Sequence, residues 1–313
     1  MRVVVSRIGQ ALLTAWAIAT LCFFFVQVLP GDVSLNIAVA RVGEDRVTPE
    51  VAERIRREEG LDRPVIVQYA AWMGQLARLD LGRSLVTRKP VVDEISYHAR
   101  FTLGLGLVGW LLSYVIALPL GLISGFRPHG LVDRITTGLS IALASLPTFL
   151  IGIGLISFFA LTLRWLPPAG FRTPSHMVLP ALTLALSLAA FSTTIIRNAV
   201  VEVRSAFYMT FARVKGLSAK SAFRHHGARN AAIPIVTFAA LQFAFVVDGF
   251  VIIETLFNYP GLGELLVRSL IARDVPIIMG ASLLIGMLYA LINLAADVIA
   301  LRLDPRRAAG LAQ

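Results

Sequence analysis

The sequence predicts an all-α polytopic membrane protein with six transmembrane helices. The chain of 313 residues is 57% hydrophobic and 15% charged, whereas about a quarter of the residues of a soluble domain are charged. Uncharged runs of about 18 residues or more recur along it, as transmembrane helices require. The net charge of +10 could indicate a nucleic-acid partner. The charges lie in short segments beside apolar runs, however, so we expect a lipid bilayer and no nucleic acid.

The first predicted helix is the uncharged run 8–29, which follows Arg2 and Arg7. As an α-helix it would span roughly 33 Å, enough to cross a bilayer. Ala38-Val39-Ala40 resembles a signal-peptidase site, but the apolar run exceeds the roughly 7–15 residues of a signal core. Residues 1–29 are therefore predicted to be an uncleaved helix. The single cysteine, Cys22, excludes an internal disulfide and a cysteine metal cluster.

Residues 30–100 form the only long polar segment, with eleven basic and eleven acidic residues. Long translocated segments do not follow the charge bias, so we predict a periplasmic insertion between the first two spans. Two helices are expected in it. One covers 48–59, with Thr48 as N-cap and Pro49 at the first position. The other is amphipathic, covers 65–79 and follows Pro64.

The second and third spans are predicted at 101–126 and 135–163, joined by a short basic turn that should lie inside. The sequence Ser-Leu-Pro-Thr-Phe around Pro147 breaks the third span. Backbone groups freed within a bilayer need a neighbouring helix or a wet cavity. Pro147 is therefore a candidate pore-lining residue, and a kink that serves packing is an equally ordinary alternative.

The fourth and fifth spans are predicted at 177–196 and 231–253. Asp248 lies near the outer end of the fifth, and a carboxylate within a span usually faces the bundle interior or water. In a pore, Asp248 would attract a substrate ammonium or guanidinium group; at the outer boundary it would simply reach water. Gln242, earlier on the same span, would share the pore lining.

The sixth span is predicted at 275–301, with Asn293 as a further pore-lining candidate and Asp297 one turn later. Asp297 is expected to pair with basic residues at the inner surface. The four segments assigned to the inside carry two, two, seven and three basic residues in chain order. This bias places both termini in the cytoplasm.

The segment 197–234 is the most basic of these, with seven basic residues against one acid, Glu202. It reads as a helix that ends at Gly216, a short second helix capped by Ser218, and a restart at Pro234, which a membrane helix tolerates in its first turn. A short helix held off the membrane surface suits docking on a soluble protein. The plain alternative is an ordinary basic inner loop.

This segment resembles the loop that ABC importer permeases offer to their ATPases, in the form found in the oligopeptide/dipeptide/nickel permease family. That form reads Tyr, then Ala-Arg-x-Lys-Gly-Leu, then His-x-x-Arg-Asn-x-x-x-Pro. Phe207 stands where the family often has an acid. The matching residues are Tyr208, Ala212, Arg213, Lys215, Gly216, Leu217, His226, Arg229, Asn230 and Pro234.

Two further strings resemble the same family and are expected in outer loops, and the resemblance extends from Arg7 to Arg306. The element after Pro260-Gly261 either dips against the pore mouth or is a plain loop, and Glu264 would begin a short helix there. The shared residues are Glu254, Phe257, Pro260, Gly261 and Gly263 in the first string, and Arg273, Asp274, Pro276 and Gly280 in the second.

The resemblance implies the first, or B-type, permease of a pair in the cytoplasmic (inner) membrane of a bacterium. Its implied partners are a homologous second permease, two ABC ATPase subunits and a periplasmic or lipid-anchored solute-binding protein. Residues 101–313 would form the core transmembrane domain, and 30–100 would either help to seat the binding protein or cover the ends of the spans. The implied ATPase contacts are Arg213, Lys215, Gly216, Leu217, Ser218, Ala219, Lys220, Ser221, Ala222, Phe223, Arg224 and His226.

The sequence lacks the motifs of an enzyme: no Gly-x-x-x-x-Gly-Lys-Ser/Thr phosphate loop, no His-Glu-x-x-His, no paired cysteines and no nucleophile elbow. We therefore expect no catalytic residue, metal site or cofactor in this chain, with ATP and Mg²⁺ bound by the partner ATPases. Two rival functions remain. An ion-coupled carrier usually has several acids at mid-membrane, and a non-transporting scaffold would not need the glycine-broken helix. The cargo is left open among peptides, nickel chelates, glutathione, opines and sugar-like solutes.

Overall fold

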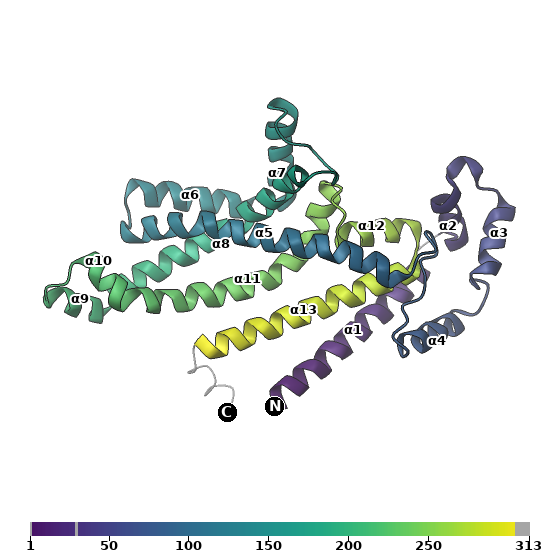
Figure 1. Ribbon diagram of the computed structural model, residues 1–313, viewed down its shortest axis with the longest axis horizontal. Coiled ribbons are helices and arrows are strands. Elements are labelled where there is room, and N and C mark those ends of the chain that lie inside the picture. Colours follow the sequence, from purple (N-terminus) through teal and green to yellow (C-terminus); the bar gives the residue numbers. More distant parts are fainter. Residues whose placement is uncertain (1, 29–30, 304–313) are drawn as a thin grey trace. The chain divides into compact units, whose positions relative to one another are not determined.

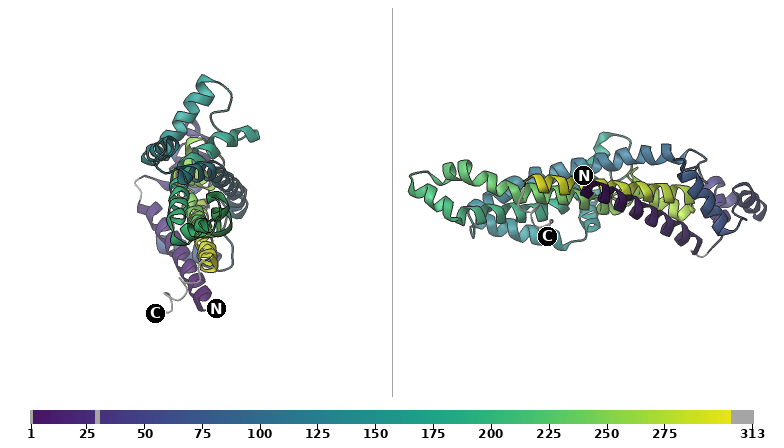
Figure 2. Two further views of the ribbon diagram at one scale, coloured as in Figure 1. Left: turned by 90° about the vertical axis from the view of Figure 1, so that its left-hand side faces the viewer. Right: turned by 90° about the horizontal axis from the view of Figure 1, so that it is seen from below.

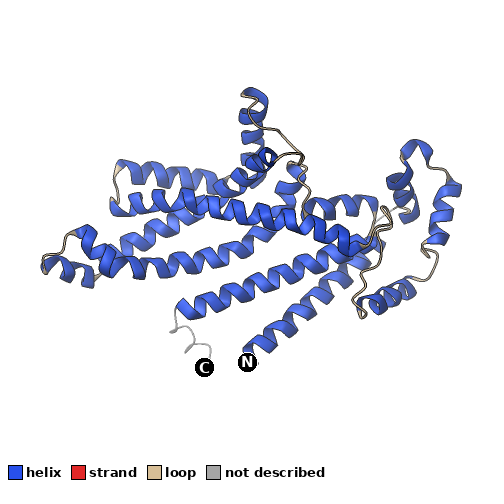
Figure 3. Cartoon of the chain, viewed as in Figure 1, coloured by secondary structure: helices blue, strands red, loops and turns tan. Residues whose placement is uncertain are grey.

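The computed structural model describes residues 2–28 and 31–303, and its regular structure there is helical (Figure 3). Within these residues the β-structure is limited to one isolated bridge, between Arg83 and Pro90. The chain divides into two compact units, which we describe separately. Unit 1 comprises Met1–Leu103 and Pro260–Leu291, and unit 2 comprises Gly104–Tyr259 and Ile292–Gln313.

Several helices have the length and composition of membrane spans (Figure 1). Among the described residues, three qualify singly: Val91–Phe126, Pro174–Ser205 and Val275–Ala296. The number rises to five if each of two bent pairs is one span: Leu12–Val28 with Val33–Val42, and Leu131–Ser145 with Thr148–Thr162. The protein is thus a helical membrane protein, and the six-span topology stays a prediction.

Among the described residues, unit 1 has three apolar clusters. Phe23 packs with Trp72 and Met279 in the first, Val91 packs with Leu262 in the second, and Ile37 packs with Ile55 in the third. The elements of this unit are α1 (Arg2–Val28), α2 (Val33–Val42), η1 (Glu44–Arg46), α3 (Pro49–Glu58), α4 (Val65–Leu76), the first turns of α5 (Val91–Phe126), α12 (Leu262–Ala272) and the first part of α13 (Val275–Leu303).

The helices predicted in the polar segment are confirmed, and one was missed. Helix α3 follows Thr48 as N-cap with Pro49 in its first turn, and α4 follows Pro64. The missed helix is α2, which begins after Asp32; the Asp32 carboxylate accepts a hydrogen bond from the backbone N–H of Ser34 at 2.9 Å. Ala38 of the Ala-Val-Ala string is fully buried in α2.

Helix α5 begins at Val91, ten residues earlier than the predicted second span. Asp93 and Glu94 lie in its first turn, where acidic side chains interact favourably with the helix dipole. The helix therefore runs without interruption through the boundary predicted at residues 100 and 101.

Unit 2 is organised around α8, which packs against α6, α7 and α11. Helices α8 and α11 run side by side, and α9 and α10 lie where α8 ends (Figures 1 and 2). The elements are the rest of α5, α6 (Leu131–Ser145), α7 (Thr148–Leu155), η2 (Ile156–Thr162), η3 (Pro174–Met177), α8 (Val178–Ser205), α9 (Phe207–Val214), α10 (Ala219–Ala222), η4 (Phe223–Gly227), α11 (Ala228–Leu256) and the end of α13.

The break in the third predicted span is far sharper than a kink. Helix α6 and the segment that starts with α7 are bent by 105°. Leu146 has extended backbone angles, φ −89° and ψ 132°, because a residue before proline is disfavoured in the helical region. Pro147 is therefore a corner between two helices.

The helix of the fifth span, predicted from residue 231 with Pro234 in its first turn, begins three residues earlier, which corrects the prediction. Helix α11 starts at Ala228, directly after the π-helical turn η4, and Pro234 lies inside it. A proline within a helix removes one backbone hydrogen bond and bends the helix, and membrane helices tolerate this. Helix α8 likewise extends to Ser205, beyond the predicted end at residue 196. Its last turns bury Ala199, Val200 and Val203.

Candidate functional site

The glycine break predicted at Gly216 is confirmed as a hydrogen-bonded helix end. The N–H of Gly216 donates to the Arg213 carbonyl at 2.9 Å, and the N–H of Leu217 donates to the Ala212 carbonyl at 3.3 Å. Gly216 has a φ of +91°, which glycine adopts without steric cost. This pair of bonds is the Schellman motif that ends a helix and reverses the chain. We call residues 206–227 the elbow. They contain α9, the turn at Gly216, α10 and η4.

The predicted cap of the second helix is also present. The Ser218 hydroxyl accepts a hydrogen bond from the backbone N–H of Ser221 at 3.3 Å, as an N-cap serine does. Helix α10 has only four residues before the π-helical η4 continues into α11. Consequently the chain turns away from α8 and returns along α11 with few residues outside regular structure.

The inner side of the elbow is apolar. Met209, Ala222 and Phe223 are buried, and they pack with Val203 of α8 and the partly buried Phe126 of α5. The Phe126 and Phe223 rings meet edge to face at 4.8 Å between centroids, a favoured aromatic geometry. The elbow is thereby attached to α5 as well as to the two helices that lead into it.

Two arginine side chains of α8 join this helix to α5 and α6. Arg204 donates through Nη1 to the carbonyl oxygens of Gly125 and Phe126, which lie at the C-terminal end of α5. Arg197 donates through Nε and Nη2 to the two oxygens of Asp133, at 2.9 and 2.8 Å, a bidentate pair that fixes geometry. Sequence reasoning treated both arginines as inner-side charges and missed their partners. The available signal was Asp133, the single acid in the turn 127–134.

The outer side of the elbow presents cations and apolar side chains. Phe207 and Val214 are 84% and 79% exposed. Within the described part of the chain, no ion pair involves the exposed cations of the elbow. The predicted contact residues that are exposed are Arg213, Lys215, Gly216, Leu217, Ser218, Ala219, Lys220, Arg224 and His226.

Three predicted contact residues are less accessible. Ser221 is partly buried, and Ala222 and Phe223 are 0% and 9% exposed. Because Ala222 and Phe223 pack inside the elbow, they support its shape rather than offer surface to a partner.

The pore-lining candidates lie in different environments. Pro147 is exposed at its corner, and Asn293 is partly buried. Gln242 is 3% exposed, donates to the Leu188 carbonyl at 3.0 Å and accepts from the Ser192 hydroxyl at 3.0 Å. Its amide thus joins α11 to α8. Asp248 belongs to α11, and its side chain lies outside the described residues, as does that of Asp297 in α13.

The first outer string ends α11 and begins α12. In unit 2, Phe257 is 1% exposed and Glu254 is fully buried; the N–H of Gly170 donates to the Phe257 carbonyl at 2.7 Å. Burial, together with the nearby Glu254 carboxylate, raises the pKa of Tyr259 to about 12.

In unit 1 the same string continues through Pro260, Gly261 and Gly263. Helix α12 begins at Leu262, with Glu264 in its first turn as predicted. The Leu262 N–H donates to the Thr102 hydroxyl at 2.7 Å, which satisfies one of the free donors at the helix start.

Arg273 and Asp274 of the second outer string are hydrogen-bonded to Gly31 and to Ser84–Val86. We call these residues together the clasp. Arg273 has a left-handed backbone, φ 54°, and donates through Nη1 to the Gly31 carbonyl at 3.1 Å. The Asp274 carboxylate accepts from the Ser84 hydroxyl and from the N–H groups of Leu85 and Val86, at 2.9 and 3.3 Å. Burial raises the pKa of Asp274, and these three donors act against that shift. Both ends of the segment that carries α2, α3 and α4 are thus tied to the turn between α12 and α13.

Comparison with known proteins agrees with this architecture. Residues 117–309 match the family described as binding-protein-dependent transport system inner membrane component, and residues 1–106 match the corresponding N-terminal membrane component. The class is therefore an ABC importer permease, an inner-membrane transport component.

Similar curated proteins extend this result over the whole chain. Glutathione transport system permease proteins GsiC from Escherichia coli O6:H1 and Shigella flexneri serotype 5b are 36% and 35% identical to it. Each alignment covers 96% of this chain and 97% of the relative. The chain belongs to the binding-protein-dependent transport system inner membrane component family, in its peptide/nickel branch, and is a permease subunit of an ABC importer.

Proposed function

We propose that the elbow is the surface through which this permease docks on a cytoplasmic ATPase, and that the chain forms half of the translocation pathway. The observation that carries the proposal is the two-sided construction of the elbow. Its inner side is packed against α5, α8 and α11, while its outer side exposes Arg213, Lys220 and Phe207. A protein partner would bury the apolar groups and meet the cations with acidic ones.

This construction also supports a mechanism of force transfer. The elbow is joined to α5, α8 and α11 by buried contacts, and Arg204 at the end of α8 ties that helix to α5. Because packed interiors are not continuously deformable, a partner that displaces the elbow would tilt these helices together. ATP binding and hydrolysis by two partner ATPases would then switch the pathway between inward-open and outward-open states.

The proposed topology has six spans: α1, α5, α6 with α7, α8, α11 and α13. The basic residues of the elbow and of the turn 127–134 would lie in the cytoplasm with both termini, following the charge bias of the inner loops. The clasp and the segment 30–100 would then lie on the periplasmic side of the inner membrane, where a periplasmic or lipid-anchored solute-binding protein delivers its cargo. A homologous second permease would complete the pathway.

The proposed cargo class is a short peptide or similar small solute. It is supported by the relatives described as glutathione transport permeases, since glutathione is itself a small peptide. The hydrolysis of ATP is assigned to the partners, because the sequence contains no phosphate-binding loop. An ion-coupled carrier or a membrane scaffold would leave the two-sided elbow without a role.

Replacing Gly216 tests the docking proposal. A Cβ at this position would meet no atom within 4 Å, so the effect of Gly216→Val comes from backbone strain, on the order of 1–3 kcal/mol. We expect solute uptake to fall about fivefold or more, since about 1.4 kcal/mol corresponds to a factor of ten, while the amount of protein in the membrane stays the same.

Two control variants test whether a loss of uptake comes from the left-handed backbone at Gly216. Gly138→Val also places the new side chain in open space, but within α6 and without a positive φ, and it should retain uptake. Gly216→Asn should retain most uptake, because asparagine tolerates the left-handed region. Wild-type uptake by the Gly216→Val variant would refute the docking assignment.

A further inference from the structure

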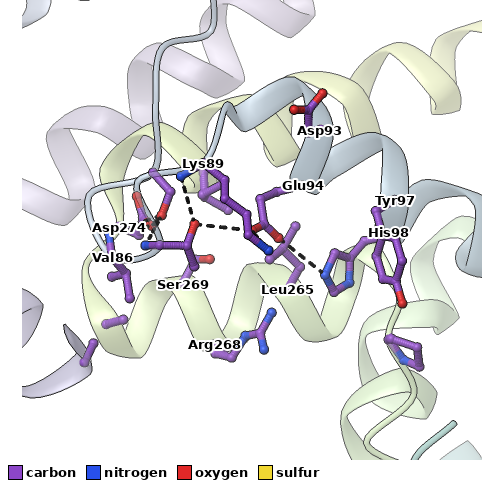
Figure 4. Close-up of a pocket in the computed structure, with 16 residues that line it drawn as sticks. Val86, Lys89, Asp93, Glu94, Tyr97, His98, Leu265, Arg268, Ser269 and Asp274 are labelled. Carbon is purple, nitrogen blue, oxygen red and sulfur yellow. Dashed lines mark hydrogen bonds and ion pairs between the residues drawn. The ribbon is translucent and has the colours of Figure 1, made fainter. Parts of the chain in front are cut away.

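Unit 1 contains a cavity of about 810 Å³ beside the clasp (Figure 4). Small-molecule sites are commonly ~300–1,000 Å³ in volume, so a short solute would fit. Its walls come from the segment between Ser84 and Lys89, the first turns of α5, and α12. Figure 4 shows Glu94 and His98 next to each other on α5, with Arg268 on the facing helix.

One wall of the cavity offers two hydrogen-bond acceptors close together. The ring of His98 is buried, and its Nδ1 lies 3.2 Å from the Gly261 carbonyl oxygen. A carbonyl oxygen only accepts, so Nδ1 carries the proton, and Nε2 of a neutral ring is then an acceptor. Nε2 lies 3.9 Å from Oε2 of Glu94, too far for a direct hydrogen bond. A cationic N–H donor, such as an ammonium group, would satisfy both acceptors.

Glu94 is suited to hold such a cation because its position is fixed. Its side chain is only 13% exposed, and its Oε1 accepts a hydrogen bond from the Thr87 hydroxyl at 3.2 Å. Lys89 approaches the same oxygen only to 3.7 Å, with 70% of its side chain exposed. An exposed ion pair at that distance contributes little, so Lys89 can turn toward a ligand.

The opposite wall carries an exposed cation. Arg268 of α12 is 60% exposed, and its Nε lies 3.6 Å from Oε1 of Glu264 one turn earlier. The guanidinium has five N–H donors in a planar fork that matches a carboxylate. The cavity thus combines an acceptor wall at Glu94 and His98 with cations at Arg268 and Lys89.

We propose that this cavity binds a small zwitterion, with its ammonium group between Glu94 and His98 and its carboxylate on Arg268 and Lys89. Amino acids and short peptides have this chemistry. The inference rests on the proposed function, because it gives the permease a cargo site of its own on the side that receives solute. It differs from the pathway candidates Pro147, Gln242, Asp248 and Asn293 in residues and in unit.

The test is binding of trialanine to the purified full chain in lipid nanodiscs, measured by saturation-transfer-difference NMR. We expect saturable binding that is weakened at least about tenfold when the peptide is N-acetylated or converted to its amide, because each change removes one charged partner. Glu94→Gln and Arg268→Gln should each weaken trialanine binding by a similar factor. Glu53→Gln and Arg54→Gln, on exposed positions of α3, are the matched controls and should bind as wild type.

Three results would overturn the proposal: no saturable binding, equal binding of the blocked peptides, or wild-type affinity in both cavity variants. Should Glu94→Gln disturb folding, Arg268→Gln still decides the question, since its side chain is exposed. Because no ATPase is present in the assay, failure of this site and failure of the docking proposal are separate outcomes.

Discussion

The elbow of unit 2 and the clasp of unit 1 are both joints between helices, but they are held together by opposite means. In the elbow the interior is apolar, and the charged side chains of Arg213, Lys220 and Arg224 lie on the surface. In the clasp the charged side chains are inside: Arg273 and Asp274 are 7% and 3% exposed and bind backbone groups.

This difference indicates different roles for charge in the two joints. Cations left on the surface are available to a partner, whereas a buried carboxylate with three donors is committed to the fold of its own chain. The comparison predicts that removing charge from the clasp destabilises the protein, and that changes in the elbow alter coupling while the protein still folds.

The largest effect is expected for Asp274→Ala. This change leaves the Ser84 hydroxyl and the Leu85 N–H without their acceptor, whereas the Val86 N–H keeps the Ser84 hydroxyl oxygen at 3.1 Å. The expected cost is about 3 kcal/mol. We expect the segment that carries α2, α3 and α4 to become sensitive to limited proteolysis and the unfolding temperature to fall. Asp45→Ala, at an exposed position of η1, should change neither. If the Asp274 variant resisted protease as wild type does, the clasp would not hold this segment.

A smaller effect is expected for Arg204→Gln, which removes the donors to the Gly125 and Phe126 carbonyls at the end of α5. The expected cost is about 1–3 kcal/mol, and its readout is coupling: less solute imported per ATP hydrolysed in proteoliposomes that contain the complete importer. Arg134→Gln, an exposed position at the start of α6, should leave that ratio unchanged. An unchanged ratio with Arg204→Gln would show that attachment to α5 is not needed for coupling.

Local features of this fold were predictable from the sequence. The helix end at Gly216, the cap at Ser218, the break at Pro147 and the start of α3 after Thr48 all depend on neighbouring residues, and the structure contains each of them. The resemblance to a permease family was recognisable because its motifs are spaced along one chain.

Contacts between distant parts of the chain were not predictable in this way. The Leu85 N–H and the Asp274 carboxylate are 189 positions apart, and Arg197 and Asp133 are 64 apart. No local pattern indicates which partner a buried charge will find, so Arg197 was interpreted only as a cytoplasmic charge. The cavity at Glu94 and His98 was missed for the same reason, since α12 reaches it from residues 262–272.

The most direct test of the docking account is the accessibility of the elbow in the membrane. Cys22 is the single cysteine, so Ala219→Cys in a Cys22→Ser background gives one reactive thiol at an exposed position of α10. We predict labelling by a membrane-impermeant maleimide in inside-out vesicles, none in intact spheroplasts, and protection when the partner ATPases are bound. Labelling from outside the cell, or equal labelling with and without the ATPases, would contradict the account.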